Sequence, residues 1–204
     1  MTRTMATQDA PGRPVADDPA FSHSLHPARP ESAVGLAEFR AGMRALPGAV
    51  MVLTTADGGQ RSGLTATAVC SLSAEPPRLL ACVNKRGQTF QMMHRARRLA
   101  VNVLAEHHHA LAECFAGFDR TVDDRFMLGR WREVELGRLP VLDDAVVAFE
   151  CDIAEIICAV SHGLVIADIT AIHVAADARP LLYADGRFAA LADTFVDPRY
   201  GFQF

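Results

Sequence analysis

The chain contains many short apolar runs, each about as long as one strand and each ended by turn-forming residues. The first three runs occupy residues 49–55, 63–73 and 79–84. An Asp-Gly-Gly turn at 57–59 and a Pro-Pro pair at 76–77 separate them, as turns separate strands in antiparallel sheets. Short strands with few helices between them favour a closed antiparallel barrel, because closure removes exposed strand edges. We therefore predict a mainly β fold, a β-barrel with peripheral helices.

Further runs continue this pattern through the rest of the chain. Strand-like runs follow at residues 99–104, 140–142, 145–159 and 163–175, with a last short strand and turn at 181–183 and 187–188. Apolar spacing and composition predict helices at residues 36–46, 89–96 and 106–115, and a short helix and loop at 122–131. The helices do not alternate regularly with the strands, and no Gly-x-Gly-x-x-Gly motif follows the first strand. A doubly wound parallel sheet is therefore disfavoured.

The length of 204 residues fits one domain that can bury a proper core. Residues 1–34 are rich in Pro, Ala, Asp, Ser and Arg and show no apolar period, which predicts a disordered N-terminal tail. We expect the globular domain over residues 35–192 and a C-terminal tail over 193–204.

Charge and cysteine content exclude several classes of function. A formal net charge of −4 argues against broad binding to nucleic acid or anionic lipid. No run of ~20 apolar residues is present, and the N-terminus lacks the layout of a secretory signal, so we expect no membrane span. Five cysteines in no paired spacing fit reduced thiols in a cytoplasmic protein. Four of them lie in apolar runs, where cysteine behaves as a small buried hydrophobe: Cys70, Cys82, Cys151 and Cys158.

The run at residues 63–73 alternates between two faces of one predicted strand. One face carries Leu64, Ala66, Ala68, Cys70 and Leu72, and the other carries Thr65, Thr67, Val69, Ser71 and Ser73. Small side chains let a planar ring approach the backbone, whose N–H and C=O groups can pair with the polar edge of a heterocycle such as an isoalloxazine. The alternative is a plain half-buried strand with a hydroxylated outer face, which composition alone favours.

The loop at residues 84–89 reads Asn-Lys-Arg-Gly-Gln-Thr and precedes a predicted helix. Helix N-termini favour anions, and Lys85 and Arg86 would add charge-assisted contacts to a phosphate. The alternative is a solvated turn in which Thr89 is a simple N-cap.

Histidines are the remaining candidates for chemistry. His162 lies in the short break between two long strands, where it could contact a bound ring or be an ordinary turn histidine. The three consecutive histidines at 107–109 point about 100° apart on a helix, so we expect a solvated helix start there and no metal site. Motifs for zinc proteases and serine hydrolases, and paired Cys-x-x-Cys ligands, are absent from the sequence.

Residues 36–190 resemble the flavin reductase-like family, the short reductase components of two-component flavin monooxygenases. The resemblance rests on the order and spacing of many short motifs. They are Phe39-Arg40, Pro47-Gly48-Ala49-Val50, Thr54-Thr55, Gly63-Leu64-Thr65-Ala66-Thr67-Ala68, Ser71-Leu72-Ser73, Pro76-Pro77, Asn84-Lys85 with Thr89, Val101-Asn102-Val103-Leu104, Arg125-Phe126 before Trp131, Leu139-Pro140-Val141-Leu142 and Pro180-Leu181-Leu182-Tyr183.

This resemblance implies a split β-barrel, a homodimer, and FMN or FAD bound near the subunit interface. It also implies hydride transfer from NADH or NADPH to the flavin, and delivery of reduced flavin to a separate monooxygenase. Carried over by motif, the ring would lie along Thr65, Ala66, Thr67, Ala68 and Val69, the ribityl chain along Cys82, Val83 and Asn84, and the phosphate at Lys85 and Thr89. His162 would lie near the nicotinamide.

One turn and one single position depart from the family pattern. Val160-Ser161-His162 stands where the family usually has Gly-Asp-His, and Gly87 stands where many members have serine. The altered turn supports an alternative from another class, a split barrel that binds flavin or haem without reductase turnover. A self-contained flavin oxygenase or oxidase is the third hypothesis.

Overall fold

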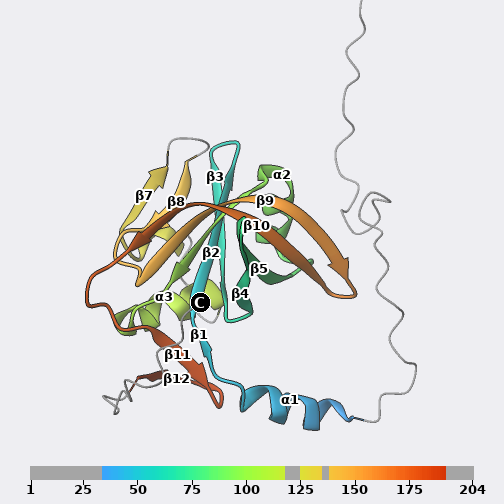
Figure 1. Cartoon of the computed structure of the whole chain (residues 1–204). Coiled ribbons are helices and arrows are strands. Elements are labelled where there is room, and N and C mark those ends of the chain that lie inside the picture. The colour runs from blue at the N-terminus through green and yellow to red at the C-terminus, as the bar shows by residue number, and fades with distance from the viewer. Residues whose placement is uncertain (1–33, 118–124, 135–137, 192–204) are drawn as a thin grey trace, which may run out of the picture.

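A computed structural model describes residues 34–117, 125–134 and 138–191. The predicted N-terminal and C-terminal tails lie outside these ranges, apart from the exposed Val34. The main element is a curled antiparallel sheet with the strand order β3-β2-β6-β9-β10-β5-β4 (Figure 1). Its strands are β2 (Met51–Asp57), β3 (Gln60–Ala66), β4 (Val69–Ala74), β5 (Pro77–Asn84), β6 (Arg98–Val103), β9 (Val147–Ala159) and β10 (His162–Val174).

The mainly β fold and the split β-barrel that the resemblance implies are confirmed, but the closed barrel that the strand pattern favoured is wrong. β3 and β4 are consecutive in the chain and form the two edges of the sheet, so the barrel is split between them. β3 pairs with β2, whereas β4 pairs with β5 on the far edge. The backbone crosses from one edge to the other at residues 67–68.

The prediction of one strand over residues 63–73 is wrong for the same reason. The run breaks at residues 67–68, so its alternation does not continue across the break. Leu64 and Ala66 pack against the barrel interior, but Cys70 and Leu72, which were predicted to share their face, are exposed. Because period-2 alternation is also compatible with two shorter strands in different registers, the sequence pattern could not reveal the break.

Two small sheets flank the main one. β1 (Gly48–Ala49) pairs with β11 (Leu181–Ala184), which pairs with β12 (Arg187–Ala190), and β7 (Trp131–Val134) pairs with β8 (Leu139–Leu142). The fully buried Asn102 joins β8 to the main sheet, because its amide donates to Val52 O at 3.0 Å and its Oδ1 accepts the Leu142 N–H at 2.9 Å. These two bonds satisfy a polar side chain that would be costly to bury unpaired.

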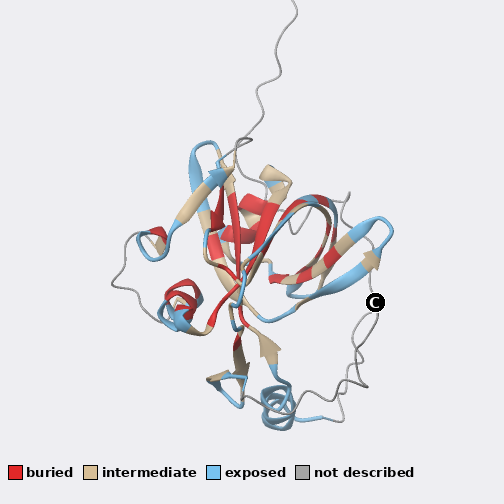
Figure 2. Ribbon diagram, turned by 60° about the vertical axis from the view of Figure 1, so that its left-hand side comes forward, coloured by how far each residue is buried: buried red, intermediate tan, exposed pale blue. Residues whose placement is uncertain are grey.

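The helices are α1 (Leu36–Arg44), α2 (Gln88–Ala96) and α3 (His109–Ala116), with short 3₁₀ turns η3 (Glu106–His108) and η4 (Arg125–Met127). None of the described helices is long and apolar enough to span a membrane. α2 closes one end of the barrel, where Phe90 and Met93 join the interior core. α3 and β8 cover the outside of β2 and β6 with a second core that contains Phe115 and Leu142. Figure 2 shows both cores as buried segments around the central strands.

All five cysteines are free thiols. Of the four expected to be buried, Cys151 is buried, Cys82 and Cys158 are half-buried, and Cys70 is exposed. Burial, assisted by the nearby Asp152 and Glu150 carboxylates, raises the pKa of the Cys151 thiol to about 12, which keeps it unreactive.

Candidate functional site

The two segments that the sequence nominated lie side by side at the split of the barrel. The Cys82 N–H donates to Ala68 O at 2.9 Å, and Val69 pairs with Ala81 across β4 and β5. The start of β4 and the end of β5 are thereby joined, although 14 positions separate Ala68 from Cys82 in the sequence. This juxtaposition presents small side chains and backbone groups on a partly open surface.

A polar cavity of about 510 Å³ lies between β3 and the start of α2. Its walls come from residues 61–64 of β3, from residues 87–89 at the start of α2, and from Arg125 and Phe126. Gly87 is the N-cap of α2 and makes no side-chain cap, so the first turn offers backbone N–H groups toward the cavity. Two arginines and a helix N-terminus around one cavity favour an anion such as a phosphate.

Thr89 lines this cavity but has a different local role from the one expected. Its hydroxyl donates to Gly63 O at 3.1 Å and shares a 2.8 Å hydrogen bond with Ser62 Oγ. Thr89 is therefore buried and fastens α2 to β3. The reading of Thr89 as N-cap is wrong, because Gly87 holds that position.

Sequence reasoning missed the two arginines of the cavity. The Arg61 guanidinium lies 4.6 Å from the centre of the Phe126 ring, and Arg125 Nη1 lies 3.5 Å from Phe115 O. Arg125-Phe126 belonged to the motifs of the resemblance, and this was the available signal. Lys85, which was nominated instead, is not among the residues that line the cavity.

A second, mostly apolar cavity of about 220 Å³ lies at the other end of β3. Thr65, Ala66 and Thr67 line it together with the Tyr183 and Phe188 rings, whose centroids are 5.5 Å apart. The Thr65 hydroxyl is engaged by Ala112 O at 2.7 Å, so Thr65 offers chiefly its backbone to any ligand. At ~3.3 Å per strand residue, the two cavities occupy successive stretches along β3.

His162 begins β10, directly opposite Asn84 at the end of β5. The Ser161 carbonyl accepts the Lys85 N–H at 3.1 Å, which joins the histidine turn to the loop before α2. The Ser161 hydroxyl lies 2.8 Å from His162 Nδ1. The serine thus supplies a hydrogen-bond partner for the ring at the place where the family's usual turn has a carboxylate.

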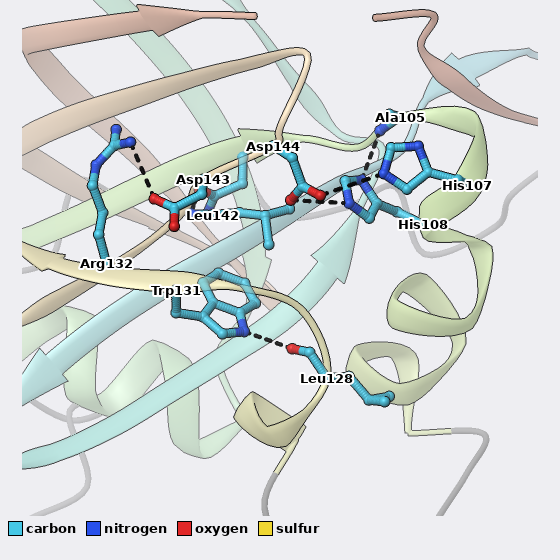
Figure 3. Close-up of polar contacts among 10 residues, drawn as sticks. Ala105, His107, His108, Leu128, Trp131, Arg132, Leu142, Asp143 and Asp144 are labelled. Atoms are coloured by element: carbon cyan, nitrogen blue, oxygen red, sulfur yellow. Dashed lines mark hydrogen bonds and ion pairs between the residues drawn. The ribbon is translucent and has the colours of Figure 1, made fainter.

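Two of the three consecutive histidines meet an aspartate (Figure 3). His107 Nε2 lies 3.5 Å from Asp144 Oδ2, and His108 Nε2 lies 3.3 Å from Asp144 Oδ1. The solvated helix start is wrong for His108, which is buried. The three ligand-type atoms lie within 4.8 Å of one another, a spacing that a metal ion could draw together.

The hydrogen bonding of His108 opposes a metal in this cluster. Its Nδ1 accepts the Ala105 N–H at 3.1 Å, so the neutral ring carries its proton on Nε2, the atom that faces Asp144. A metal-bound neutral imidazole needs that proton on the other nitrogen. Burial and the neighbouring His107 lower the pKa of His108, which keeps the ring in this neutral form. Burial acts to raise the pKa of Asp144, but His108 and hydrogen bonds from His107 and the backbone outweigh it and hold that pKa below its usual range. His108 therefore caps the start of η3, and Asp144 holds its ring in place.

Comparison with known proteins places these features in a family. A model described as flavin reductase like domain matches residues 43–192. The chain belongs to the flavin reductase-like family. The FMN reductase (NADH) RutF 1 of Methylorubrum extorquens strain PA1 is 38% identical over 169 residues, which covers 82% of this chain and 81% of the relative. The FMN reductase (NADH) RutF of Variovorax paradoxus strain S110 is 37% identical, with 76% of this chain and 86% of the relative covered.

Solved structures of flavin reductases share the split-barrel fold. A putative flavin reductase from Haemophilus somnus 129PT is 31% identical with a TM-score of 0.73, covering 78% of this chain and 100% of the other. Flavin reductase PheA2 is 29% identical with a TM-score of 0.71, covering 78% and 99%. The Streptomyces globisporus NADH:FAD oxidoreductase SgcE6, solved with NAD and FAD fragments, is 27% identical with a TM-score of 0.71, covering 77% and 93%.

Proposed function

We propose that this protein is an NADH-dependent flavin reductase that transfers hydride to FMN and supplies reduced flavin to a separate monooxygenase. The observation that carries the proposal is the contact of residues 68–69, where the chain leaves β3 and enters β4, with the end of β5 beside an arginine-lined cavity, in a chain 38% identical to an FMN reductase (NADH). The residues present suit a flavin phosphate, because the cavity combines two guanidinium groups with a helix N-terminus.

In the proposed arrangement the flavin phosphate binds at Arg61, Arg125 and the first turn of α2. The isoalloxazine lies along Thr65, Ala66, Thr67, Ala68 and Val69, and the ribityl chain passes Cys82, Val83 and Asn84. Lys85 lies on the adjoining turn and adds positive charge at long range. This assignment keeps the ring positions nominated from the sequence and moves the main phosphate contacts to the two arginines.

The protein contributes chiefly by positioning. When bound, the flavin supplies the redox chemistry, accepting at N5 a hydride from C4 of the nicotinamide. The chain holds the two rings in contact, and such proximity supplies a large part of the rate enhancement. His162 is exposed at the start of β10, where its ring, oriented by Ser161, can contact the nicotinamide. No side chain need transfer a proton in the hydride step.

A homodimer completes the proposal. The outer face of β5 and β10 carries paired apolar side chains that no described helix covers. Cys82 lies opposite Leu164, and Leu80 lies opposite Ile166, and all four are only partly buried. Residues that face each other across strands lie on the same side of the sheet, so they form one apolar patch beside the flavin cradle. A second copy packed there would shield the bound ring from water. The free cysteines support a cytoplasmic location.

Steady-state assays test this proposal. Purified protein is mixed with NADH or NADPH and with FMN or FAD, and loss of absorbance at the nicotinamide band is followed. Turnover is expected with NADH and FMN. Tight flavin binding without turnover in all four combinations would establish the binding-module alternative. Substrate oxygenation without any added oxygenase would establish the self-contained oxygenase.

A further inference from the structure

The N-terminal helix α1 packs least on the rest of the described chain. None of its residues is buried, and Figure 2 shows the helix exposed along its length. Leu36, Phe39, Met43 and Leu46 fall on one side of this segment, and each is between 51 and 66% exposed. Leu36, Phe39 and Met43 belong to α1, and Leu46 lies just beyond its end. Large apolar side chains on one face of a helix normally mark a face that packs against something.

α1 is fixed at one end only. The Asp185 N–H donates to Arg44 O at 2.8 Å and ties the last turn of α1 to the β11–β12 hairpin. In Figure 1 the helix then runs away from the barrel. Isolated helices shorter than ~12–15 residues are marginal in water, and α1 has nine residues. Its stability therefore depends on a surface that the described part of its own chain does not supply.

The barrel has an apolar cavity of about 340 Å³ at the end opposite α2. Apolar side chains from the seven-stranded sheet line it: Met51, Val69, Leu79, Val101, Phe149 and Ile169. Ser71 contributes to the cavity wall from the edge strand β4 and is exposed to solvent. Among the described residues, none fills this space, which adjoins the free edge of the split barrel. We call this cavity the barrel mouth.

We propose that α1 of one copy docks on the barrel mouth of a second copy, with Phe39 entering the cavity. Within the described ranges, the apolar side of α1 is exposed and the apolar barrel mouth is unfilled. A two-fold axis satisfies both at once, because each copy gives its helix and receives the other, and the assembly closes as a dimer. The four apolar side chains would supply part of a standard interface, which buries ~800 Å² per partner. The patch on β5 and β10 supplies further area. The inference builds on the proposed homodimer and is independent of the flavin used.

Disulfide trapping tests this contact. In Phe39→Cys/Ser71→Cys the new thiols of two copies would approach each other, because Ser71 lines the barrel mouth, and mild oxidation is expected to give a covalent dimer on a non-reducing gel. Phe39→Cys alone should not form that dimer. Ala41→Cys/Ser71→Cys, with the helix thiol on the opposite face of α1, should not form it either. A failure of Phe39→Cys/Ser71→Cys to cross-link, or equal cross-linking by Ala41→Cys/Ser71→Cys, overturns the docking.

Solution mass provides a second test that does not depend on thiol chemistry. The wild-type chain is expected to be a dimer by light scattering. Phe39→Ser/Met43→Ser should raise the dimer dissociation constant at least tenfold, whereas Glu38→Ser/Ala41→Ser should leave it unchanged. Both pairs are exposed, so neither should impair folding. An unchanged dissociation constant in the first pair overturns the helix docking but leaves the homodimer and the reductase proposals standing. A monomeric wild-type chain overturns the docking and the homodimer together.

Discussion

Gly163 tests how tightly β10 packs on α2. In Gly163→Ala the new Cβ would lie 2.3 Å from Phe90 Cε2 and 2.7 Å from Phe90 Cζ, and 3.4 Å from Ile156 Cγ2 on another side. Ordinary contact begins at 3.4 Å, so the ring must move by about 1.1 Å. Phe90 is fully buried within the interior core and has little room to move. Overpacking of well-packed cores costs about 1–3 kcal/mol, and we expect the upper end, about 3 kcal/mol of unfolding free energy.

Urea denaturation measures this loss as a lower transition midpoint with an unchanged slope. The matched control is Gly42→Ala, because nothing lies within 4 Å of a Cβ at that position. It should cost nothing. Phe90→Leu removes the clashing part of the ring, so Gly163→Ala should cost less in that background than in the wild type. A loss below about 0.5 kcal/mol in Gly163→Ala, or strict additivity with Phe90→Leu, would refute the packing argument.

Three further predictions concern the site and the histidine cluster. Arg125→Gln should weaken FMN binding by about 10-fold or more, as expected for a lost charge-assisted bond, and leave riboflavin binding unchanged. Titration of the protein with FMN and with riboflavin measures both affinities. Lys85→Ala should also weaken FMN binding more than riboflavin binding, but by a smaller factor than Arg125→Gln. Equal losses of affinity for both flavins would contradict the assignment of the phosphate to this cavity. His162→Ala should lower kcat/KM for NADH by ~10–100-fold with flavin affinity intact, and unchanged stopped-flow hydride transfer would remove His162 from the site. The pKa of His108 is lowered in the folded protein, so the neutral ring stabilises the fold. This stabilisation is complete above pH 6.5, the ordinary pKa of histidine, and is lost as the pH falls from 6.5 toward the folded-state pKa. Thermal melts of His108→Asn should show a weaker pH dependence in that window, and an identical profile would contradict the neutral-cap role.

The sequence predicted most of the helices, strands and hairpin turns, but it did not predict which distant strands lie next to one another. Turn residues at 57–59 and 76–77 marked two hairpins that the structure contains. The helix expected at residues 89–96 is α2, and the helix expected at residues 106–115 is η3 followed by α3. These features depend on local spacing, which a single sequence carries. The split between β3 and β4 depends on which strand offers a free edge, and no local pattern encodes that choice.

The candidate site shows the same division. The ring-facing segment and the segment that ends in Asn84 were both nominated from the residues, and the resemblance joined them as one cradle. The sequence assigned the phosphate to Lys85 and Thr89 because they adjoin a helix start. In the structure the cavity beside that helix start is completed by Arg61 and Arg125, which lie far away in the chain.

By itself the sequence determined the strand-rich class, the family and the two segments of the flavin cradle, because each depends on residue types at short spacing. Only the tertiary structure decided that the barrel is split between β3 and β4, that two arginines complete the anion cavity, and that His108 is a neutral cap. It also left α1 and the barrel mouth without partners in the described chain. All of these depend on which distant residues meet, and that outcome is set by the packing of the whole sheet.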